Sequence, residues 1–167
     1  GERLPFKCGN VTIGDNVLSD VQTNIHLAGV RGVTITGNTL WQGYAHNMLI
    51  EDSEHVLVGP NMLERNPLYG YTSEGKCNVI FHGCRDCTIQ GLHLHNVIDS
   101  EAGLTIEKCN RMNIVGCTIL DCDNVGLLVK DSDDIHWDAS IIGDTRPGST
   151  SARLKTVDAN GNLIEQK

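Results

Sequence analysis

Four side chains that could carry acid–base chemistry occur at the ends of short apolar stretches. Glu51, His82, Glu107 and Lys130 close segments such as Asn-Met-Leu-Ile-Glu and Asn-Val-Ile-Phe-His. If these segments are neighbouring parallel strands, the two glutamates lie two strands apart, roughly 9–10 Å at the backbone. Two carboxyl groups about 6.5–9.5 Å apart can act as general acid and general base in an inverting glycosidase. His82, between the two glutamates, could serve as a proton carrier.

The same row has a second interpretation, in which it does no chemistry. Its side chains alternate between negative and potentially positive, and opposite charges on neighbouring strands stabilise a sheet. A solvated ladder of alternating charge would give the same residues at the same spacing. The pattern leaves both interpretations open.

The elements that must position this row form a repeat. Gly-Val-Thr-Ile-Thr-Gly-Asn-Thr-Leu at 32–40 returns as His-Val-Leu-Val-Gly-Pro-Asn-Met-Leu at 55–63, and related phrases recur every 22 to 31 residues. A period of this length predicts a solenoid of about six coils, each with three short strands. The strands expected to carry the row cover residues 24–28, 47–51, 78–82, 103–107 and 126–130.

Aligning the repeats assigns the cysteines to the core. Cys84 and Cys109 fall at one position with the small residue Ser53, and Cys87 falls at a second inward position. We expect them to pack as small hydrophobes, because strand alternation disfavours a metal or redox pair at Cys84-x-x-Cys87. The count of seven cysteines also fits poorly with a disulfide framework.

Turn positions of the first three coils share an asparagine. Asn16, Asn38 and Asn61 align, and we expect their amides to form a ladder that bonds to the turn backbone. Later coils place apolar or small residues there.

A second outward row is apolar at Leu49, Ile80 and Leu128. If the register is correct, this stripe is exposed, and a contiguous exposed apolar stripe marks a contact surface. We expect a covering segment, a loop or another subunit there.

One coil carries an insertion between Leu63 and Asn78. Insertions in solenoids form loops on one face, often the binding face. We expect this loop to overhang the row at His82, with a plain surface loop as the alternative. The candidate substrate-binding residues are Lys130, the insertion residues Arg65, Tyr69 and Tyr71, and the nearby Trp41 and Tyr44.

The period, the asparagine turn and the inward stacks together resemble the right-handed parallel β-helix of the pectin-lyase-like superfamily. The resemblance covers residues 4–142 and implies an all-β, single-stranded parallel β-helix that binds carbohydrate along the sheet bearing Glu51 and His82. It also favours an extracellular or periplasmic location, and a homotrimer through Leu49, Ile80 and Leu128. The family's catalytic signatures are incomplete in this sequence. Phe-His-Gly at 81–83 and Arg-Leu-Lys at 153–155 match two of the catalytic motifs in part, and the paired aspartates are missing.

Composition sets the remaining limits. A net charge of −8 argues against a nucleic-acid partner, and no apolar run is long enough for a membrane helix.

Residues 1–142 are expected to form the β-helix, and residues 143–167 a linker and a hairpin that could cap it. The chain begins almost inside the repeat, which favours a piece of a longer protein. No cofactor is expected, except that the acidic turn at 131–134 could bind calcium weakly.

These observations predict a carbohydrate-active β-helix protein that binds, and could cleave, a polysaccharide. Hydrolysis is favoured over lyase chemistry, because neither outward row contains the arginine that a lyase site needs. The alternatives are a non-catalytic glycan-binding or assembly module of a larger surface or phage-like protein, and a pure scaffold.

Overall fold

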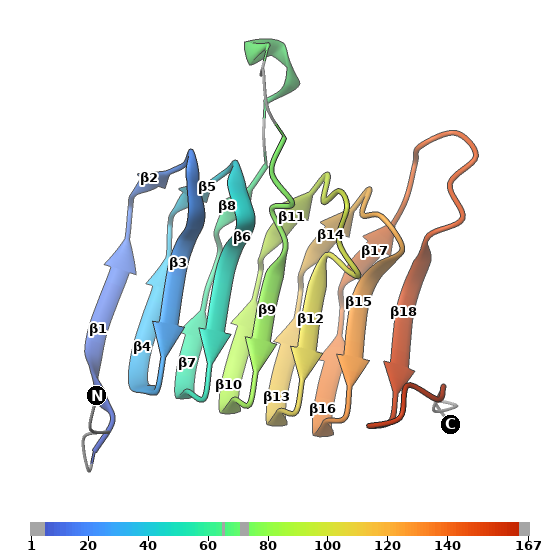
Figure 1. The fold of residues 1–167 in the computed structure, drawn as a ribbon. Helices are drawn as coiled ribbons and strands as arrows, with labels where there is room; N and C mark the ends of the chain where they lie inside the picture. The colour runs from blue at the N-terminus through green and yellow to red at the C-terminus, as the bar shows by residue number, and fades with distance from the viewer. Residues whose placement is uncertain (1–5, 65, 71–73, 164–167) are drawn as a thin grey trace.

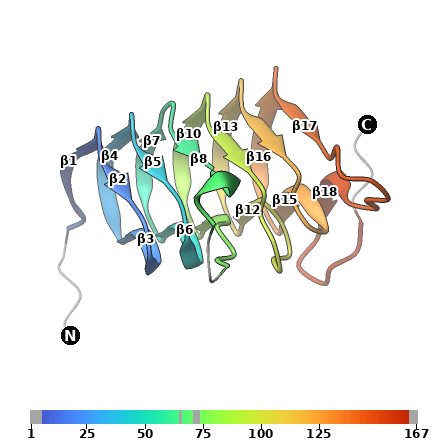
Figure 2. The same cartoon turned by 90° about the horizontal axis from the view of Figure 1, so that it is seen from above.

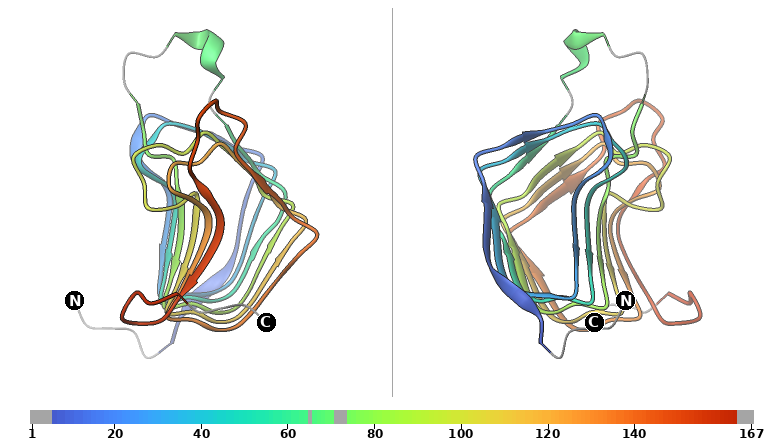
Figure 3. Two further views of the ribbon diagram at one scale, coloured as in Figure 1. Left: turned by 90° about the vertical axis from the view of Figure 1, so that its right-hand side faces the viewer. Right: turned by 60° about the vertical axis from the view of Figure 1, so that its left-hand side comes forward.

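The computed structural model describes residues 6–64, 66–70 and 74–163 and shows a parallel β-solenoid of about six turns. Successive coils follow one another along a single axis, with the strands Cys8–Gly14 and Ala152–Val157 at opposite ends of the solenoid (Figures 1 and 2). Seen along that axis, three sheets enclose the core (Figure 3). The fold class expected from the repeat is therefore confirmed.

Each sheet contains six parallel strands, one from each coil. The first sheet consists of β1 (Cys8–Gly14), β4 (Val30–Thr36), β7 (Glu54–Val58), β10 (Arg85–Gln90), β13 (Asn110–Val115) and β16 (Asp133–Asp138). The second consists of β2 (Val17–Leu18), β5 (Thr39–Leu40), β8 (Met62–Leu63), β11 (His93–His95), β14 (Thr118–Leu120) and β17 (Ile141–Gly143). The third consists of β3 (Val21–Ala28), β6 (Gly43–Glu51), β9 (Val79–His82), β12 (Leu104–Glu107), β15 (Val125–Lys130) and β18 (Ala152–Val157).

The strand register agrees with the sequence alignment. Met48 pairs with Val79, and Ile50 pairs with Phe81, as the inward stacks require. These side chains are fully buried in one core cluster that spans the coils. Because side chains alternate along a strand, this register turns the intervening residues of β6 and β9 outward.

The asparagine ladder is also confirmed. Asn16 Nδ2 donates to Asn38 Oδ1 at 3.0 Å, and Asn38 Nδ2 donates to Asn61 Oδ1 at 2.9 Å. The Asn38 amide nitrogen also donates to the Ile13 carbonyl at 3.0 Å. These bonds satisfy turn groups that would otherwise be buried without partners.

None of the seven cysteines, all of which the structure describes, forms a disulfide, and six of them are buried. The backbone N–H of Cys84 donates to Cys109 Sγ at 3.4 Å, so these thiols share one stack as expected. Burial raises the pKa of Cys87 to about 11 and that of Cys122 to about 12. Such thiols are protonated at neutral pH and act as core packing.

The predicted apolar stripe is wrong at its last member. Leu128 is buried, in a small cluster with Ala102 and Val125. The cause is the connection between β11 and β12, which brings Ala102 against the outward face of the third sheet. Leu49 and Ile80 remain half-buried, so the exposed stripe is shorter than expected, and a trimer through it stays a prediction.

The segment expected to be a linker and cap contains a strand of the solenoid. β18 pairs in parallel with β15 through partners such as Leu127 and Leu154. The expected hairpin is limited to one antiparallel bridge between Val157 and Leu163, and its second strand, at 162–165, lies partly outside the described residues. The third sheet thus extends to Val157, because Leu154 continues an inward stack; the domain boundary after residue 142 itself stays a prediction. In the described part of the chain, no helix is long and apolar enough to cross a membrane.

Candidate functional site

The row predicted from the sequence lies on the outward face of the third sheet. Glu51, His82, Glu107 and Lys130 are the last residues of β6, β9, β12 and β15. The register pairs Glu51 with His82, His82 with Glu107, and Glu107 with Lys130. All four are half-buried. The sequence-based placement of these residues on consecutive coils is therefore correct.

The ion pairs within this row differ from the expected ones. Glu51 Oε2 lies 2.8 Å from Nε2 of His26, which belongs to the other outward row. Glu107 Oε1 lies 3.6 Å from Lys130 Nζ. Among the described residues, His82 forms no ion pair with either glutamate. Each carboxylate thus has a basic neighbour, and the imidazole between them remains available to a ligand.

The first sheet gives a useful contrast. There, Glu54 lies between two arginines, with 2.7 Å from its Oε1 to Arg31 Nη1 and a second ion pair to Arg85. The hydrogen bond from Arg31 is the main cause that lowers the pKa of Glu54. This carboxylate is saturated by protein donors, as a structural ion pair would be. We therefore regard the third sheet as the better candidate for ligand contacts.

The insertion does not overhang the row. It contains the short helix η1 (Pro67–Tyr69), and it precedes β9, whereas His82 ends β9. β9 is four residues long, so His82 lies roughly 13 Å along the strand from the point where the insertion ends. The helix η1 lies away from the sheets, beyond the ends at which the strands of the third sheet begin (Figures 1 and 3). The expected overhang was wrong because the insertion enters at the first residue of the strand, whereas His82 is its last residue.

Three of the other predicted substrate-binding residues, Trp41, Tyr44 and Tyr69, are described by the structure and lie far from the row along the strands. Tyr69 is exposed on η1. Trp41 precedes β6, and Tyr44 lies near its start, at the opposite end from Glu51. Arg65 and Tyr71 lie outside the described residues. Binding by these residues stays a prediction, and so does calcium binding by the turn at 131–134.

An acid–imidazole–acid contact does occur, at a different place. His95 Nε2 lies 3.0 Å from Asp121 Oδ2, and His95 Nδ1 lies 3.4 Å from Glu64 Oε1. Burial opposes ionisation of Asp121, but the Thr145 N–H and His95 hold its pKa below the ordinary value. This cluster joins three consecutive coils where the second sheet passes into the third.

Sequence reasoning did not bring these three residues together. They lie at or beyond the ends of β8, β11 and β14, where connection lengths vary and the strand period gives no register. One signal was present, because Glu64 and His95 directly follow the aligned residues Leu63 and Leu94. The diagonal contact to Asp121 required the backbone geometry of the turn.

The comparisons with known proteins concern the fold. The sequence matches a right-handed beta helix region over residues 23–167. The chain belongs to the right-handed beta helix family. Among solved structures, one chain similar to this one is a protein from Parabacteroides merdae described as a "putative glycosyl hydrolase". It is 11% identical with a TM-score of 0.35, and the match covers 92% of this chain and 85% of that chain. A comparison with curated proteins gave no match.

Proposed function

We propose that this β-helix binds a polysaccharide that lies across the coils on the outward face of its third sheet. The observation that carries the proposal is the register of Glu51, His82 and Glu107 on three consecutive coils, with the His82 imidazole free of partners among the described residues. Coils in a parallel sheet repeat about every 4.8 Å. A linear ligand running along the solenoid would meet one titratable side chain per coil.

The chemistry of these side chains suits sugar hydroxyl groups. Carboxylates accept hydrogen bonds, and an imidazole can both donate and accept. Leu49 and Ile80 lie beside the row, two residues before Glu51 and His82 on the same strands, and are half-buried. Their exposed parts could contact the apolar faces of sugar rings. Resemblance to the pectin-lyase-like superfamily, whose members bind carbohydrate along the corresponding sheet, adds support.

Hydrolysis is a second candidate function at the same site. Glu51 and Glu107 lie two coils apart, roughly 9–10 Å at the backbone, a spacing that can accommodate the separation of about 6.5–9.5 Å between the carboxyl groups of inverting glycosidases. In such a reaction one carboxyl group protonates the departing glycosidic oxygen. The other removes a proton from the water that attacks the anomeric carbon. His82 would position that water or the sugar.

A panel of neutral and acidic polysaccharides tests both functions. Affinity electrophoresis measures binding, and assays of reducing ends and of unsaturated products separate hydrolysis from lyase cleavage. We expect His82→Ala to weaken binding at least tenfold, whereas His136→Ala, which removes an exposed histidine of β16, leaves it unchanged. Binding that survives His82→Ala, Glu51→Gln and Glu107→Gln would exclude this face.

Cleavage has its own readout in the same panel. If the chain is a hydrolase, Glu51→Gln and Glu107→Gln each abolish the release of reducing ends while thermal unfolding stays cooperative. The exposed Glu101, in the connection before β12, provides the matched control Glu101→Gln. A wild-type chain that binds a polysaccharide without cleaving it identifies a glycan-binding module.

A further inference from the structure

A cavity of about 510 Å³ lies at the end of the solenoid, away from the third-sheet row. It is bounded by the connection between β17 and β18 and by the connections that follow β11 and β14. Small-molecule sites have volumes of about 300–1,000 Å³. The lining is polar and includes Asp99, Asp123, Asn124, Arg146 and Thr150.

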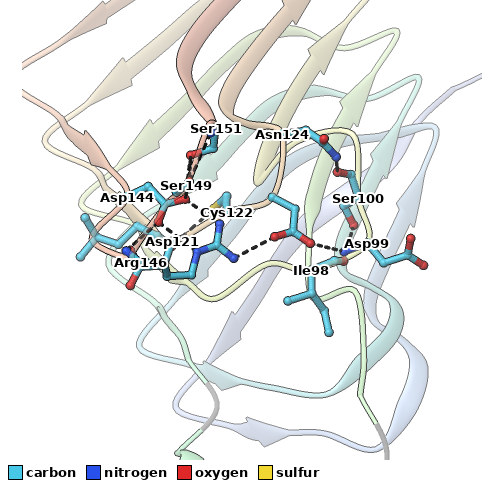
Figure 4. A network of polar contacts seen from close by, with 12 residues as sticks. Ile98, Asp99, Ser100, Asp121, Cys122, Asn124, Asp144, Arg146, Ser149 and Ser151 are labelled. Carbon is cyan, nitrogen blue, oxygen red and sulfur yellow. Dashed lines mark hydrogen bonds and ion pairs between the residues drawn. The ribbon is translucent and has the colours of Figure 1, made fainter.

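The wall of this cavity is held by a network centred on Asp144 and Arg146 (Figure 4). Arg146 donates to Asp144 through Nε at 2.9 Å and through Nη2 at 2.6 Å, and to Asp123 through Nη1 at 2.8 Å. The hydroxyls of Ser149 and Ser151 donate to Asp144 Oδ2 at 2.6 and 2.7 Å. These bonds fix the loop that forms one side of the cavity before any ligand arrives, which lowers the entropic cost of binding.

Several polar groups on the cavity side are not used by this network. The carboxylate of Asp99 is 89% exposed, and its one ion pair within the described residues is a distant one, 3.8 Å from Lys76 Nζ. The backbone N–H of Asp99 donates to Asp123 Oδ2 at 2.9 Å, so the backbone of Asp99 is held in place. Asn124 donates through Nδ2 to the Ser100 carbonyl at 2.7 Å, which leaves its amide oxygen as an acceptor.

Donors are present as well. Arg146 has two terminal nitrogens with two hydrogens each, and one hydrogen of each is used by Asp123 and Asp144. The remaining hydrogens and the exposed hydroxyl of Thr150 can serve a ligand. The cavity thus combines carboxylate, amide, hydroxyl and guanidinium groups.

The charges narrow the class of ligand. Two carboxylates in the lining, Asp99 and Asp123, oppose one guanidinium, which is already paired with Asp144. An anionic ligand such as a uronate would meet net repulsion. A bound cation would have to displace Arg146 from Asp123, whose two oxygens both accept hydrogen bonds. A neutral polyhydroxylated ligand can donate to the carboxylates and accept from Arg146 and Thr150.

We propose that this cavity binds one neutral sugar unit, as a site separate from the third-sheet row. The proposal does not depend on the function proposed for that row. The two sites lie at opposite ends of β15, since Lys130 ends the strand and Asn124 precedes it.

Nuclear magnetic resonance titration of the isotopically labelled chain tests this site. The probes are the methyl glycosides of glucose, galactose, mannose and N-acetylglucosamine, with galacturonate as the anionic control. We expect at least one neutral glycoside to shift the backbone signals of Asp99, Asn124 and Thr150 in a saturable manner. Galacturonate at the same concentrations should give no saturable shift there.

Variants separate this site from the row. Asp99→Ala and Thr150→Ala should each raise the dissociation constant of that glycoside at least fivefold. Glu101→Ala, which removes an exposed side chain of the same connection as Asp99, should leave the dissociation constant measured from the signals at the cavity unchanged. His82→Ala, in the third-sheet row, should leave the dissociation constant at the cavity unchanged as well. The proposal is overturned if no neutral glycoside produces saturable shifts, if galacturonate binds as well, or if Asp99→Ala and Thr150→Ala bind like the wild type.

Discussion

The carboxylate of Glu51 pairs with His26, at 2.8 Å between Glu51 Oε2 and His26 Nε2, and not with His82, its register partner on the next coil. This contact connects the two outward rows of the third sheet. It leaves the His82 imidazole without a partner among the described residues, between Glu51 and Glu107. The proposed glycan contact at His82 follows from this arrangement.

The asparagine ladder should contribute strongly to stability. Asn38 is buried, and Asn38→Ala removes the acceptor for the Asn16 backbone N–H and the side-chain donor to Asn61 and Ile13. Unsatisfied buried groups cost about 1–3 kcal/mol each, and we expect a loss of about 2–4 kcal/mol in the free energy of unfolding. Urea denaturation measures this loss.

The matched control occupies the same ladder position at the end of the solenoid. Ser140 Oγ accepts from the Cys117 N–H at 3.1 Å but is only half-buried. Water can replace it, so Ser140→Ala should cost less than about 1 kcal/mol. Equal losses in the two variants would contradict the structural role assigned to the inner asparagines.

Leu128 should behave as a core residue. Because it packs with Ala102 and Val125, Leu128→Ala should lower the free energy of unfolding by about 2–5 kcal/mol. Leu49→Ala, on the same outward row but half-buried, should cost clearly less. Chemical denaturation of both variants gives the comparison. A negligible effect at Leu128 would mean that the connection with Ala102 does not cover the sheet in solution.

Thiol reactivity should follow burial. Cys8 is exposed and the other six cysteines are buried. Because burial also raises the pKa of several buried thiols, Ellman's reagent should modify one thiol rapidly in the folded chain and seven after denaturation. Cys8→Ser should abolish the rapid phase. A rapid phase that persists in this variant would show that the buried stack opens readily.

The Asp144–Arg146 pair should make stability depend on pH. Arg146 beside Asp144 holds the pKa of this carboxyl far below its ordinary value of 3.8. A folded-state pKa below the unfolded-state pKa stabilises the fold above the unfolded value, and this stabilisation is lost as the pH falls toward the folded value. Asp144→Asn should therefore be less stable than the wild type at pH 7.

The difference between the two proteins should narrow as the pH falls below about 4. Thermal unfolding from pH 7 to pH 3 measures this difference in stability. The control is Asp133→Asn, which replaces an exposed aspartate of β16 and should leave the stability close to that of the wild type. A gap for Asp144→Asn that is constant across this range would contradict the assignment of the ion pair.

The sequence predicted the strand register because burial imposes it. Met48, Val79 and Leu104 must all face the core, and a one-residue shift would expose them. The register in turn placed Glu51, His82 and Glu107 on one row. The choice of His26 as the partner of Glu51 could not be predicted, because several neighbours lie within reach and side-chain geometry selects among them.

Features outside the repeat were the least predictable. The burial of Leu128 depends on Ala102, in a connection whose path no periodicity describes. The contact between His95 and Asp121 likewise depends on the backbone of the turns. The cavity beside Arg146 forms where three such connections meet, and the sequence showed only a segment rich in glycine and serine.

Nuclear magnetic resonance of the histidine side chains tests the central claim most directly. Polysaccharides that bind in the panel are added to the chain with labelled imidazoles. We predict that the ring signals of His82 shift with the same dissociation constant as overall binding, while those of His136, on the first sheet, do not. Binding that leaves the His82 signals unchanged would contradict the proposed glycan site.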